Sequence, residues 1–242
     1  MYAIKTMGLA KKYGKITAVD GLDLEIRRGE LFALLGVNGA GKSTAIRMLS
    51  CLTRPTSGDA LIEGHSILSD EQNIKRMIAV SPQETAVAPN LTARENLDLI
   101  LGIHGFSAER RRARIAELAE ELGLSDVLDR RAGKLSGGWS RRLSIAMALA
   151  SEPRVLFLDE PTLGLDVISR AELWELIRSL SGKVTILLTT HYMEEAEALS
   201  DRIGIMKDGR MLAVGSADEL MASTGESRLE TAFISIVRRC EG

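Results

Sequence analysis

A glycine-rich segment at residues 36–43 constrains the fold of this chain more than any other feature of its sequence. The segment reads Gly-Val-Asn-Gly-Ala-Gly-Lys-Ser and directly follows an apolar run at residues 31–35. This is the full P-loop pattern, in which a buried strand ends in a loop that wraps a polyphosphate and continues into a helix. An incidental glycine-rich turn explains the pattern poorly, because strand, loop and helix come in the required order.

The P-loop chemistry assigns a role to each part of this segment. Glycines let the backbone approach a polyphosphate closely, and the N–H groups at the start of the following helix attract it. We expect Lys42 to reach the β- and γ-phosphates and to be catalytic, and the Ser43 hydroxyl to ligate Mg²⁺. The expected nucleotide-binding residues are Gly36, Asn38, Gly39, Ala40, Gly41, Lys42, Ser43 and Thr44.

A pair of acids provides the second half of the expected site. The apolar run at residues 155–158 ends in Asp159 and Glu160. Asp159 is expected to hold Mg²⁺ through its water shell, since hard cations prefer oxygen ligands. Glu160 is expected to polarise the attacking water as general base. Acids at strand ends are common in nucleotide-binding sheets, so this pair gains its weight from the P-loop beside it.

The alternation of strands and helices predicts the fold class. Four short apolar runs indicate strands buried on both faces of a mainly parallel sheet, at residues 31–35, 78–80, 155–158 and 184–188. Three earlier segments alternate in polarity and predict a smaller antiparallel sheet at one edge, at residues 3–7, 22–26 and 60–62. The dipeptide Asp208-Gly209 lies between two apolar runs and predicts a hairpin.

The middle of the chain, about residues 89–151, contains no strand pattern and is predicted to be helical. Thr92 and Glu95 form a capping box at the start of one helix, and Ser107 is suited to cap the next. We therefore predict an α/β P-loop NTPase core of mainly parallel sheet, with an antiparallel β edge subdomain and an inserted α-helical lobe. The expected P-loop domain spans residues 1–220, followed by a short C-terminal extension at 221–242.

Composition limits the classes of function. The chain has 242 residues and a net charge of −2, so no global attraction to nucleic acid is expected. Its two cysteines, Cys51 and Cys240, are far apart and predict no disulfide framework, which suits a reducing cytoplasm. The N-terminus lacks a signal-peptide pattern, and every apolar run is too short to cross a bilayer. We expect a peripheral subunit if the protein acts at a membrane.

A third motif, Leu135-Ser136-Gly137-Gly138, lies between the P-loop and the acid pair. It resembles the signature motif of ABC (ATP-binding cassette) ATPases, and other motifs of that family follow in order. These are Tyr13 in Lys-Lys-Tyr-Gly, Gln83 in Ser-Pro-Gln, Asp166 in Gly-Leu-Asp, and His191 after Leu-Thr-Thr. The resemblance covers about residues 2–220, and the chain is identified as a member of this family.

The resemblance implies ATP and Mg²⁺ as ligands and adds residues to the site. Tyr13 is expected to stack on adenine, Gln83 to contact Mg²⁺ or the attacking water, and His191 to touch the γ-phosphate as a catalytic residue. Taken singly, each of the three has an ordinary explanation, as a surface tyrosine, a loop glutamine and a packed histidine. The family pattern also implies that Ser136, Gly137 and Gly138 contact ATP held by another subunit, with Asp166 at the dimer interface.

Two positions depart from the family pattern. Trp139 stands where the signature usually continues with Gln, and Val167 stands where a Pro often follows the Gly-Leu-Asp loop. The serine and glycines of the signature are intact, so no loss of activity is inferred. Instead, Trp139 is expected to alter contacts on the ribose side or packing at the dimer interface.

The resemblance also implies partners and a location. We expect a second ATPase subunit, identical or different, and integral membrane permease subunits, at the cytoplasmic face of the cell membrane. The segment from Thr190 to Glu197 is similar to ATPases of ABC-2 type exporters, the group of sodium-extrusion and drug-efflux systems. An exporter is therefore favoured over an importer. A non-transport ABC ATPase acting on a soluble macromolecule is the rival, and the signature motif argues against a P-loop kinase.

Overall fold

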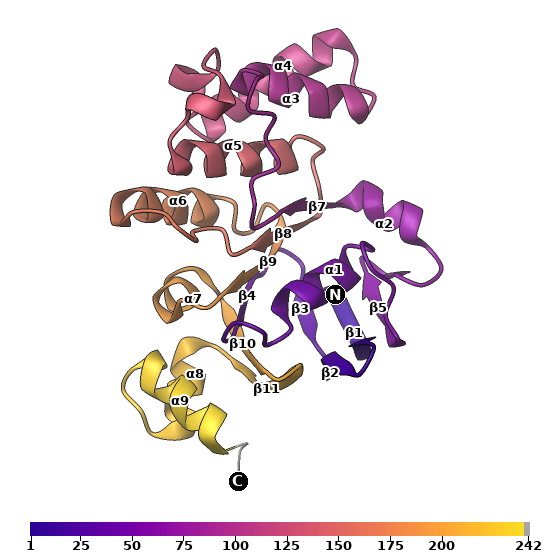
Figure 1. Ribbon diagram of the computed structural model, residues 1–242, viewed down its shortest axis with the longest axis vertical. Helices are drawn as coiled ribbons and strands as arrows, with labels where there is room; N and C mark the ends of the chain where they lie inside the picture. The colour runs from indigo at the N-terminus through magenta and orange to yellow at the C-terminus, as the bar shows by residue number, and fades with distance from the viewer. Residues whose placement is uncertain (240–242) are drawn as a thin grey trace.

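The structure is a computed structural model that describes residues 1–239, so Cys240 of the disulfide argument lies outside the described residues. Three parts follow one another from end to end (Figure 1): a helical region, a central sheet flanked by a second sheet, and a pair of C-terminal helices. Within residues 1–239, no helix combines the length and the apolar character that crossing a membrane requires.

The central sheet confirms the predicted mainly parallel architecture. Its strand order is β11-β10-β4-β9-β8-β7, and every neighbouring pair is parallel except β10 with β11. The strands are β4 (Leu31–Leu35), β7 (Ile78–Ser81), β8 (Val155–Asp159), β9 (Thr185–Thr190), β10 (Arg202–Lys207) and β11 (Arg210–Gly215). The hairpin expected around Asp208-Gly209 joins β10 to β11, which confirms that prediction.

The second sheet is antiparallel, as predicted, and contains the first strands of the chain. Its strands are β1 (Tyr2–Tyr13), β2 (Ile16–Leu22), β3 (Glu25–Arg27), β5 (Ser57–Ile62) and β6 (His65–Ser66). The strand expected at residues 22–26 is divided between β2 and β3. Asp23 lies at the break, where its carboxylate accepts a hydrogen bond of 2.7 Å from the Gly8 N–H and turns the chain.

Helices surround the two sheets. They are α1 (Lys42–Leu49), α2 (Glu71–Met77), α3 (Ala93–Ile103), α4 (Ala108–Glu121), α5 (Gly137–Leu149), α6 (Val167–Ser179), α7 (Met193–Leu199), α8 (Ala217–Thr224) and α9 (Leu229–Arg239), with two 3₁₀ turns at Ser125–Val127 and Ala132–Lys134. Helices α3 and α4 form the top of Figure 1 with α5 beneath them. The predicted capping box of Thr92 and Glu95 starts α3, and the Ser107 hydroxyl caps α4.

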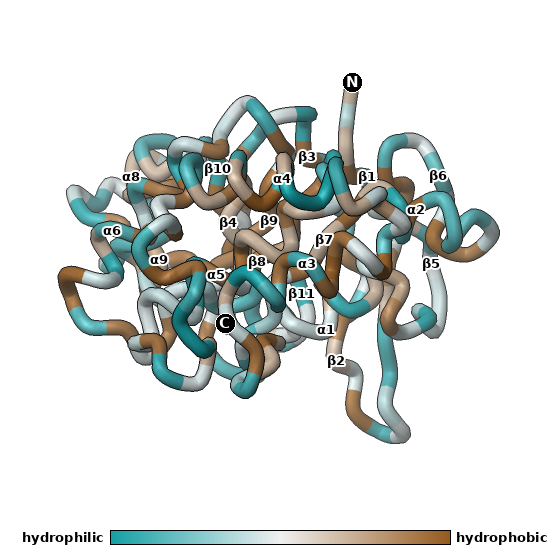
Figure 2. Tube along the Cα trace, turned by 90° about the horizontal axis from the view of Figure 1, so that it is seen from above, coloured by the Kyte–Doolittle hydropathy of each residue, from teal (hydrophilic) through white to brown (hydrophobic). Residues whose placement is uncertain are grey.

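Strand β4 shows why the apolar runs lack alternation. Leu31, Ala33 and Leu35 face one hydrophobic cluster, whereas Phe32 and Leu34 face another on the opposite side of the sheet. Successive side chains of a strand point to opposite faces, so a strand covered on both faces must be apolar throughout. The tube in Figure 2 accordingly carries hydrophobic colour along the central strands. This covered sheet gives the residues at its strand ends a rigid support.

The C-terminal helices belong to the same packed body. Leu229, Phe233 and Ile236 of α9 are buried in the cluster that also contains Ala196 and Leu199 of α7. The boundary expected at residue 220 therefore falls within α8, between elements that share one core.

Cys51 lies at the end of the α1 region and is half-buried rather than fully enclosed. It packs against the second hydrophobic cluster, and desolvation by burial raises the pKa of its thiol. Among residues 1–239 it is a free cysteine.

Candidate nucleotide-binding site

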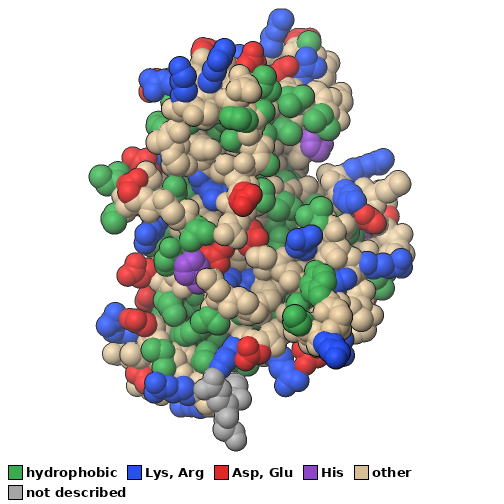
Figure 3. Space-filling view, in the orientation of Figure 1, with side chains coloured by type: hydrophobic (Ala, Val, Ile, Leu, Met, Phe, Trp, Pro, Cys, Tyr) green, Lys and Arg blue, Asp and Glu red, His purple; other side chains and the backbone are tan. Residues whose placement is uncertain are grey.

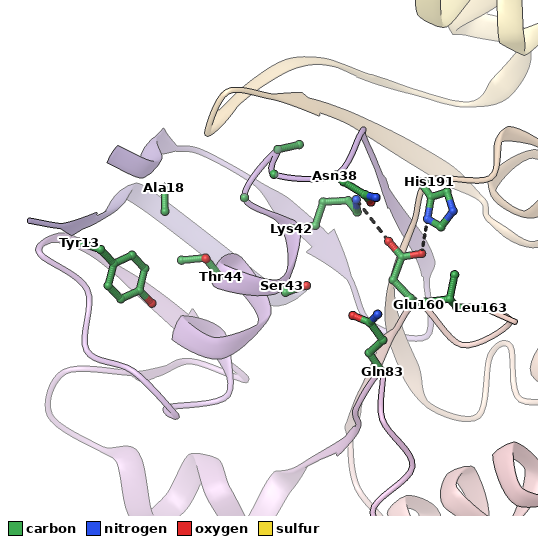
Figure 4. A pocket seen from close by; sticks show the side chains of 13 residues that line it. Tyr13, Ala18, Asn38, Lys42, Ser43, Thr44, Gln83, Glu160, Leu163 and His191 are labelled. Atoms are coloured by element: carbon green, nitrogen blue, oxygen red, sulfur yellow. Dashed lines mark hydrogen bonds and ion pairs between the residues drawn. The ribbon is translucent and has the colours of Figure 1, made fainter. Parts of the chain in front are cut away.

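One open cavity of about 550 Å³ lies beside the start of α1 (Figure 4). It is lined by residues from segments far apart in the sequence: Tyr13, Ala18, Asn38, Gly39, Ala40, Gly41, Lys42, Ser43, Thr44, Gln83, Glu160, Leu163 and His191. Eleven of these thirteen are residues expected from the sequence, whereas Ala18 and Leu163 are additions that no motif identified. Tyr13 lies at the far side of the cavity from Glu160 and His191.

Two glycines of the P-loop are required by close backbone approaches. Gly41 has a φ of 103°, and a Cβ there would lie 2.3 Å from the Ala18 carbonyl oxygen. A Cβ on Gly36 would lie 2.3 Å from the Met206 carbonyl oxygen. Gly41 also begins α1 without a side-chain cap, so the first N–H groups of the helix are free to bind an anion.

A buried charge cluster forms one wall of the cavity. Lys42 Nζ lies 3.3 Å from Glu160 Oε1, and His191 Nδ1 lies 2.6 Å from Glu160 Oε2. The dashed lines of Figure 4 mark both contacts. Glu160 is only 6% exposed, and Lys42 also donates to the Gly36 carbonyl oxygen at 2.8 Å. The Glu160 carboxylate is thus held between the lysine that begins α1 and the histidine that follows β9.

The backbone of Glu160 is unusual. Its φ is 50°, a left-handed conformation that non-glycine residues adopt infrequently and that clusters at functional sites. The Glu160 N–H donates both to the carbonyl oxygen and to the hydroxyl of Thr189, each at 3.1 Å. These bonds to β9 hold the turn and direct the carboxylate toward the P-loop.

Two hydroxyl groups contact Asp159, the other acid of the pair. The Ser43 hydroxyl donates to Asp159 Oδ1 at 3.0 Å, and the Thr189 hydroxyl donates to the same oxygen. The Gln83 side chain lines the same cavity as Ser43. A carboxylate, a hydroxyl and an amide oxygen are ligands that Mg²⁺ prefers, so this group of residues fits the predicted metal.

The Gln83 loop is fastened to α5 by a residue that the sequence motifs did not indicate. Arg141 is 5% exposed, and its guanidinium donates to the carbonyl oxygens of Pro82 and Gln83 at 2.7 and 2.6 Å. Two buried hydroxyls, those of Ser81 and Ser144, lie 3.0 Å apart beside it. Arg141 stands between a serine and another arginine, so no pattern in the sequence singles it out.

The signature residues lie outside this cavity. Ser136 caps α5 by accepting from the Trp139 N–H, and a Cβ on Gly138 would meet the Ser169 hydroxyl at 2.9 Å. Asp166 caps α6, and the bonds it accepts from the backbone and hydroxyl of Ser169 lower the pKa of its carboxyl. The structure therefore groups Ser136, Gly137, Gly138 and Asp166 on a separate surface, at the start of two helices.

Both departures from the family pattern are on that surface. Trp139 is partly buried, with the Arg142 guanidinium 5.0 Å from its ring centroid. Val167 and its neighbour Ile168 are 77% and 72% exposed. On the face of the molecule drawn in Figure 3, basic and acidic side chains are interspersed without a large area of one sign.

Comparison with known proteins decides the family. A sequence model of the family described as "ABC transporter" matches residues 19–163, which is more than half of the chain. This chain belongs to the ABC transporter family. The match includes the P-loop, the signature motif and the acid pair, so the ABC assignment rests on the same residues that build the cavity and the adjacent surface.

Relatives of this ABC protein include drug-resistance proteins. The daunorubicin resistance ATP-binding protein DrrA3 of Streptomyces coeruleorubidus is 45% identical over 232 residues, covering 96% of this chain and 73% of the relative. The doxorubicin resistance ATP-binding protein DrrA of Mycobacterium tuberculosis is 44% identical over 231 residues, covering 94% and 70%.

Solved structures of ABC proteins share the fold. CbiO1 of Clostridium perfringens, part of the transporter complex cbiONQ, matches with a TM-score of 0.84 and 28% identity, over 91% of each chain. The cassette MJ0796, dimeric in a post-hydrolysis state with ADP and Pi, matches with a TM-score of 0.78 and 31% identity, over 88% of this chain and 98% of that one. The chain is an ATP-binding ATPase subunit, of a family whose cassettes form dimers and work with membrane subunits.

Proposed function

We propose that this ABC ATPase powers the export of a small molecule through separate integral membrane subunits, docked at the cytoplasmic face of the membrane. The names of the drug-resistance relatives support this proposal, as does the similarity of residues 190–197 to ABC-2 type exporters. Daunorubicin and doxorubicin are the drugs of those relatives, and the substrate proposed for this chain is an ion, a drug or another small molecule.

Hydrolysis in the proposed site depends on Glu160. The observation that carries this assignment is the Glu160 carboxylate, enclosed between Lys42 and His191 at the edge of the P-loop cavity. ATP would lie with its phosphates along residues 36–44 and its adenine on Tyr13. Glu160 then accepts a proton from the attacking water, while His191 orients Glu160 and Lys42 stabilises charge on the phosphates.

Mg²⁺ would be held by Ser43, Asp159 and Gln83. When bound, it neutralises charge on the phosphate oxygens. Of these three, Gln83 has a second role in the proposal, because its loop is tied to α5 by Arg141 and thereby links the site to the helical region.

The signature surface would serve a second ATPase subunit. Ser136 and the N-terminus of α5 form a helix start suited to bind an anion. Among the described residues, those that line the P-loop cavity do not include this helix start, so it is available to a nucleotide held by another subunit. In a head-to-tail dimer, Ser136, Gly137 and Gly138 would contact ATP in the partner, with Asp166 beside them. ATP favours the closed dimer, and hydrolysis removes that preference.

The variant Glu160→Gln tests the catalytic proposal. Loss of a general base is expected to lower turnover by about 10²- to 10⁴-fold while ATP binding persists, so an ATP-bound dimer should accumulate. Steady-state hydrolysis and size-exclusion chromatography with ATP measure both effects. Glu30→Gln is the matched control, because Glu30 is a buried acid that pairs with Arg202 at the opposite end of β4. Rapid steady-state turnover by Glu160→Gln would remove Glu160 from its role.

Co-purification tests the transport proposal. Tagged Glu160→Gln protein is recovered from native membranes in mild detergent with ATP, and the accompanying chains are identified by mass spectrometry. A polytopic membrane protein in stoichiometric amount is expected. Recovery of only soluble proteins, ribosomes or DNA would overturn the transport proposal and leave the ATPase assignment standing.

A further inference from the structure

Helix α7, which follows His191, carries a fully buried acid. Glu194 and Glu197 are exposed, whereas Glu195 is 0% exposed and points into the protein. Neither the P-loop chemistry nor any motif assigns it a function. A buried carboxyl is costly unless it is paired or hydrogen-bonded, so its contacts indicate what it is for.

One oxygen of Glu195 joins three elements of the site. The Thr162 hydroxyl donates to Glu195 Oε1 at 2.7 Å, and the Trp174 indole N–H donates to the same oxygen at 3.2 Å. Thr162 is 1% exposed and lies two residues after Glu160, in the loop that leads to Asp166. Trp174 belongs to α6, which begins directly after that loop. Glu195 therefore connects the Glu160 loop and α6 to the helix that follows His191.

The other oxygen of Glu195 has no partner that would compensate a negative charge. Among residues 1–239, Glu195 Oε2 has no hydrogen-bond partner, and no salt bridge reaches this residue. Desolvation by burial raises the pKa of Glu195. The nearby Thr190 hydroxyl and the two donors Thr162 and Trp174 oppose this rise, and the Glu160 carboxylate adds to it least.

No cation forms an ion pair with Glu195 among the described residues. Arg141 on α5 interacts with it electrostatically, but two of the guanidinium nitrogens donate to the Pro82 and Gln83 carbonyl oxygens and the third, Nε, has no hydrogen-bond partner. Arg170 on α6 stands 5.0 Å from the ring centroid of Tyr192 instead. That ring in turn lies 4.1 Å from the ring of His191, which gives α6 and the His191 segment a second link.

We propose that Glu195 is a positioning residue for hydrolysis: as a neutral carboxylic acid, it accepts two hydrogen bonds that hold the Glu160 loop and α6 against α7, and so sets Glu160 relative to His191. This inference rests on the proposed roles of Glu160 and His191. It requires an acceptor at Oε1, and it requires neither a negative charge nor a proton transfer at Glu195.

Two variants separate the acceptor from the charge. Glu195→Gln keeps the carbonyl acceptor, so kcat should stay within about twofold of the parent, with the same pH profile. Glu195→Met fills similar space but leaves Thr162 and Trp174 without an acceptor. Small displacements of catalytic groups cost up to about 10²-fold, so kcat of Glu195→Met should fall by about 10- to 100-fold with little change in KM for ATP. Glu30→Met is the control for loss of stability alone, because Glu30 is also a buried acid but does not contact the site.

Melting temperatures provide a readout of the neutral state. A carboxyl that is protonated when folded and ionised when unfolded loses stability as the pH rises above its ordinary pKa of 4.5. Glu195→Gln has no such loss, so its melting temperature should gain on the parent as the pH rises.

A large loss of kcat in Glu195→Gln would show that the charge or a proton of Glu195 is used, and would overturn the inference. So would a normal kcat in Glu195→Met, or a melting difference that does not change with pH. The proposed role of Glu160 as general base is tested separately: normal hydrolysis by Glu160→Gln would refute that role, whatever the Glu195 variants show.

Discussion

Replacing Arg141 by methionine tests how the Gln83 loop is held. In the parent protein, the guanidinium is almost completely buried and donates to two backbone carbonyl oxygens of that loop, those of Pro82 and Gln83. Methionine keeps most of the apolar stem of the side chain but removes both donors. The loop carrying a proposed Mg²⁺ and water contact thereby loses its two bonds from Arg141 but keeps the Ser81–Ser144 contact with α5.

The magnitude follows from the contacts. Hydrogen bonds from a charged donor contribute about 1.5–3 kcal/mol each, which gives an upper value of roughly 3–6 kcal/mol for the pair. Two effects reduce this value. Residue Gln83 is exposed, so water can reach its freed carbonyl, and the variant no longer buries a guanidinium whose pKa desolvation lowers. We expect a net loss of about 2–3 kcal/mol in the free energy of unfolding, together with a clear fall in kcat.

Urea unfolding and steady-state ATP hydrolysis measure the two effects. Arg112→Met is the matched control, because Arg112 is exposed on α4 and its replacement should change the free energy of unfolding by less than about 0.5 kcal/mol. If Arg141→Met stays within the same 0.5 kcal/mol and retains full kcat, the loop is held by other contacts and the reasoning is refuted.

Three further predictions concern the P-loop, the metal and a helix cap. Gly41→Ala should weaken ATP binding, measured calorimetrically, more than Gly39→Ala. Both glycines have a left-handed φ, 103° and 83°, but only a Cβ at Gly41 also meets a backbone oxygen, at 2.3 Å, whereas one at Gly39 meets nothing within 4 Å. Ser43→Ala should raise the Mg²⁺ concentration needed for half-maximal hydrolysis, and an unchanged Mg²⁺ titration would contradict the assigned ligand. Asp166→Ala should lower the melting temperature at neutral pH, since it removes the cap of α6. The pKa of Asp166 is below its ordinary 3.8, so that difference should disappear as the pH falls through the lower, folded-state value.

Local sequence was sufficient to predict elements that are encoded by neighbouring residues. The P-loop needs only a strand, a run of glycines and a helix start, all contiguous along the chain. Strand β4 ends directly before the loop and α1 begins at its end, as predicted. The capping box of Thr92 with Glu95 and the hairpin at Asp208-Gly209 are local in the same sense. By contrast, the division of the 22–26 segment was not foreseen, and Asp23 at the break contacts Gly8 of β1, farther back in the chain.

The order of the family motifs predicted which residues would form the site, but no spacing along the chain states how they meet. Lys42, Glu160 and His191 follow three different strands, and their contacts arise because β4, β8 and β9 are parallel neighbours with their carboxyl ends at one edge. Ser136 and Asp166 lie on a different surface, at the starts of α5 and α6. The sequence alone shows them as two more motifs in the same order and does not separate them from the cavity.

Burial was the property that the sequence left open. Glu194, Glu195 and Glu197 are alike in a one-dimensional pattern, and only the packing of α7 against α6 turns Glu195 inward, where Trp174 and Thr162 reach it. Arg141 is similarly one of several arginines until α5 is placed beside the Gln83 loop. Residue types and local order thus specified the chemistry and the strand-loop-helix that holds it, whereas long-range packing set the distances, the charge environment and the supporting contacts, because these depend on which distant elements become neighbours.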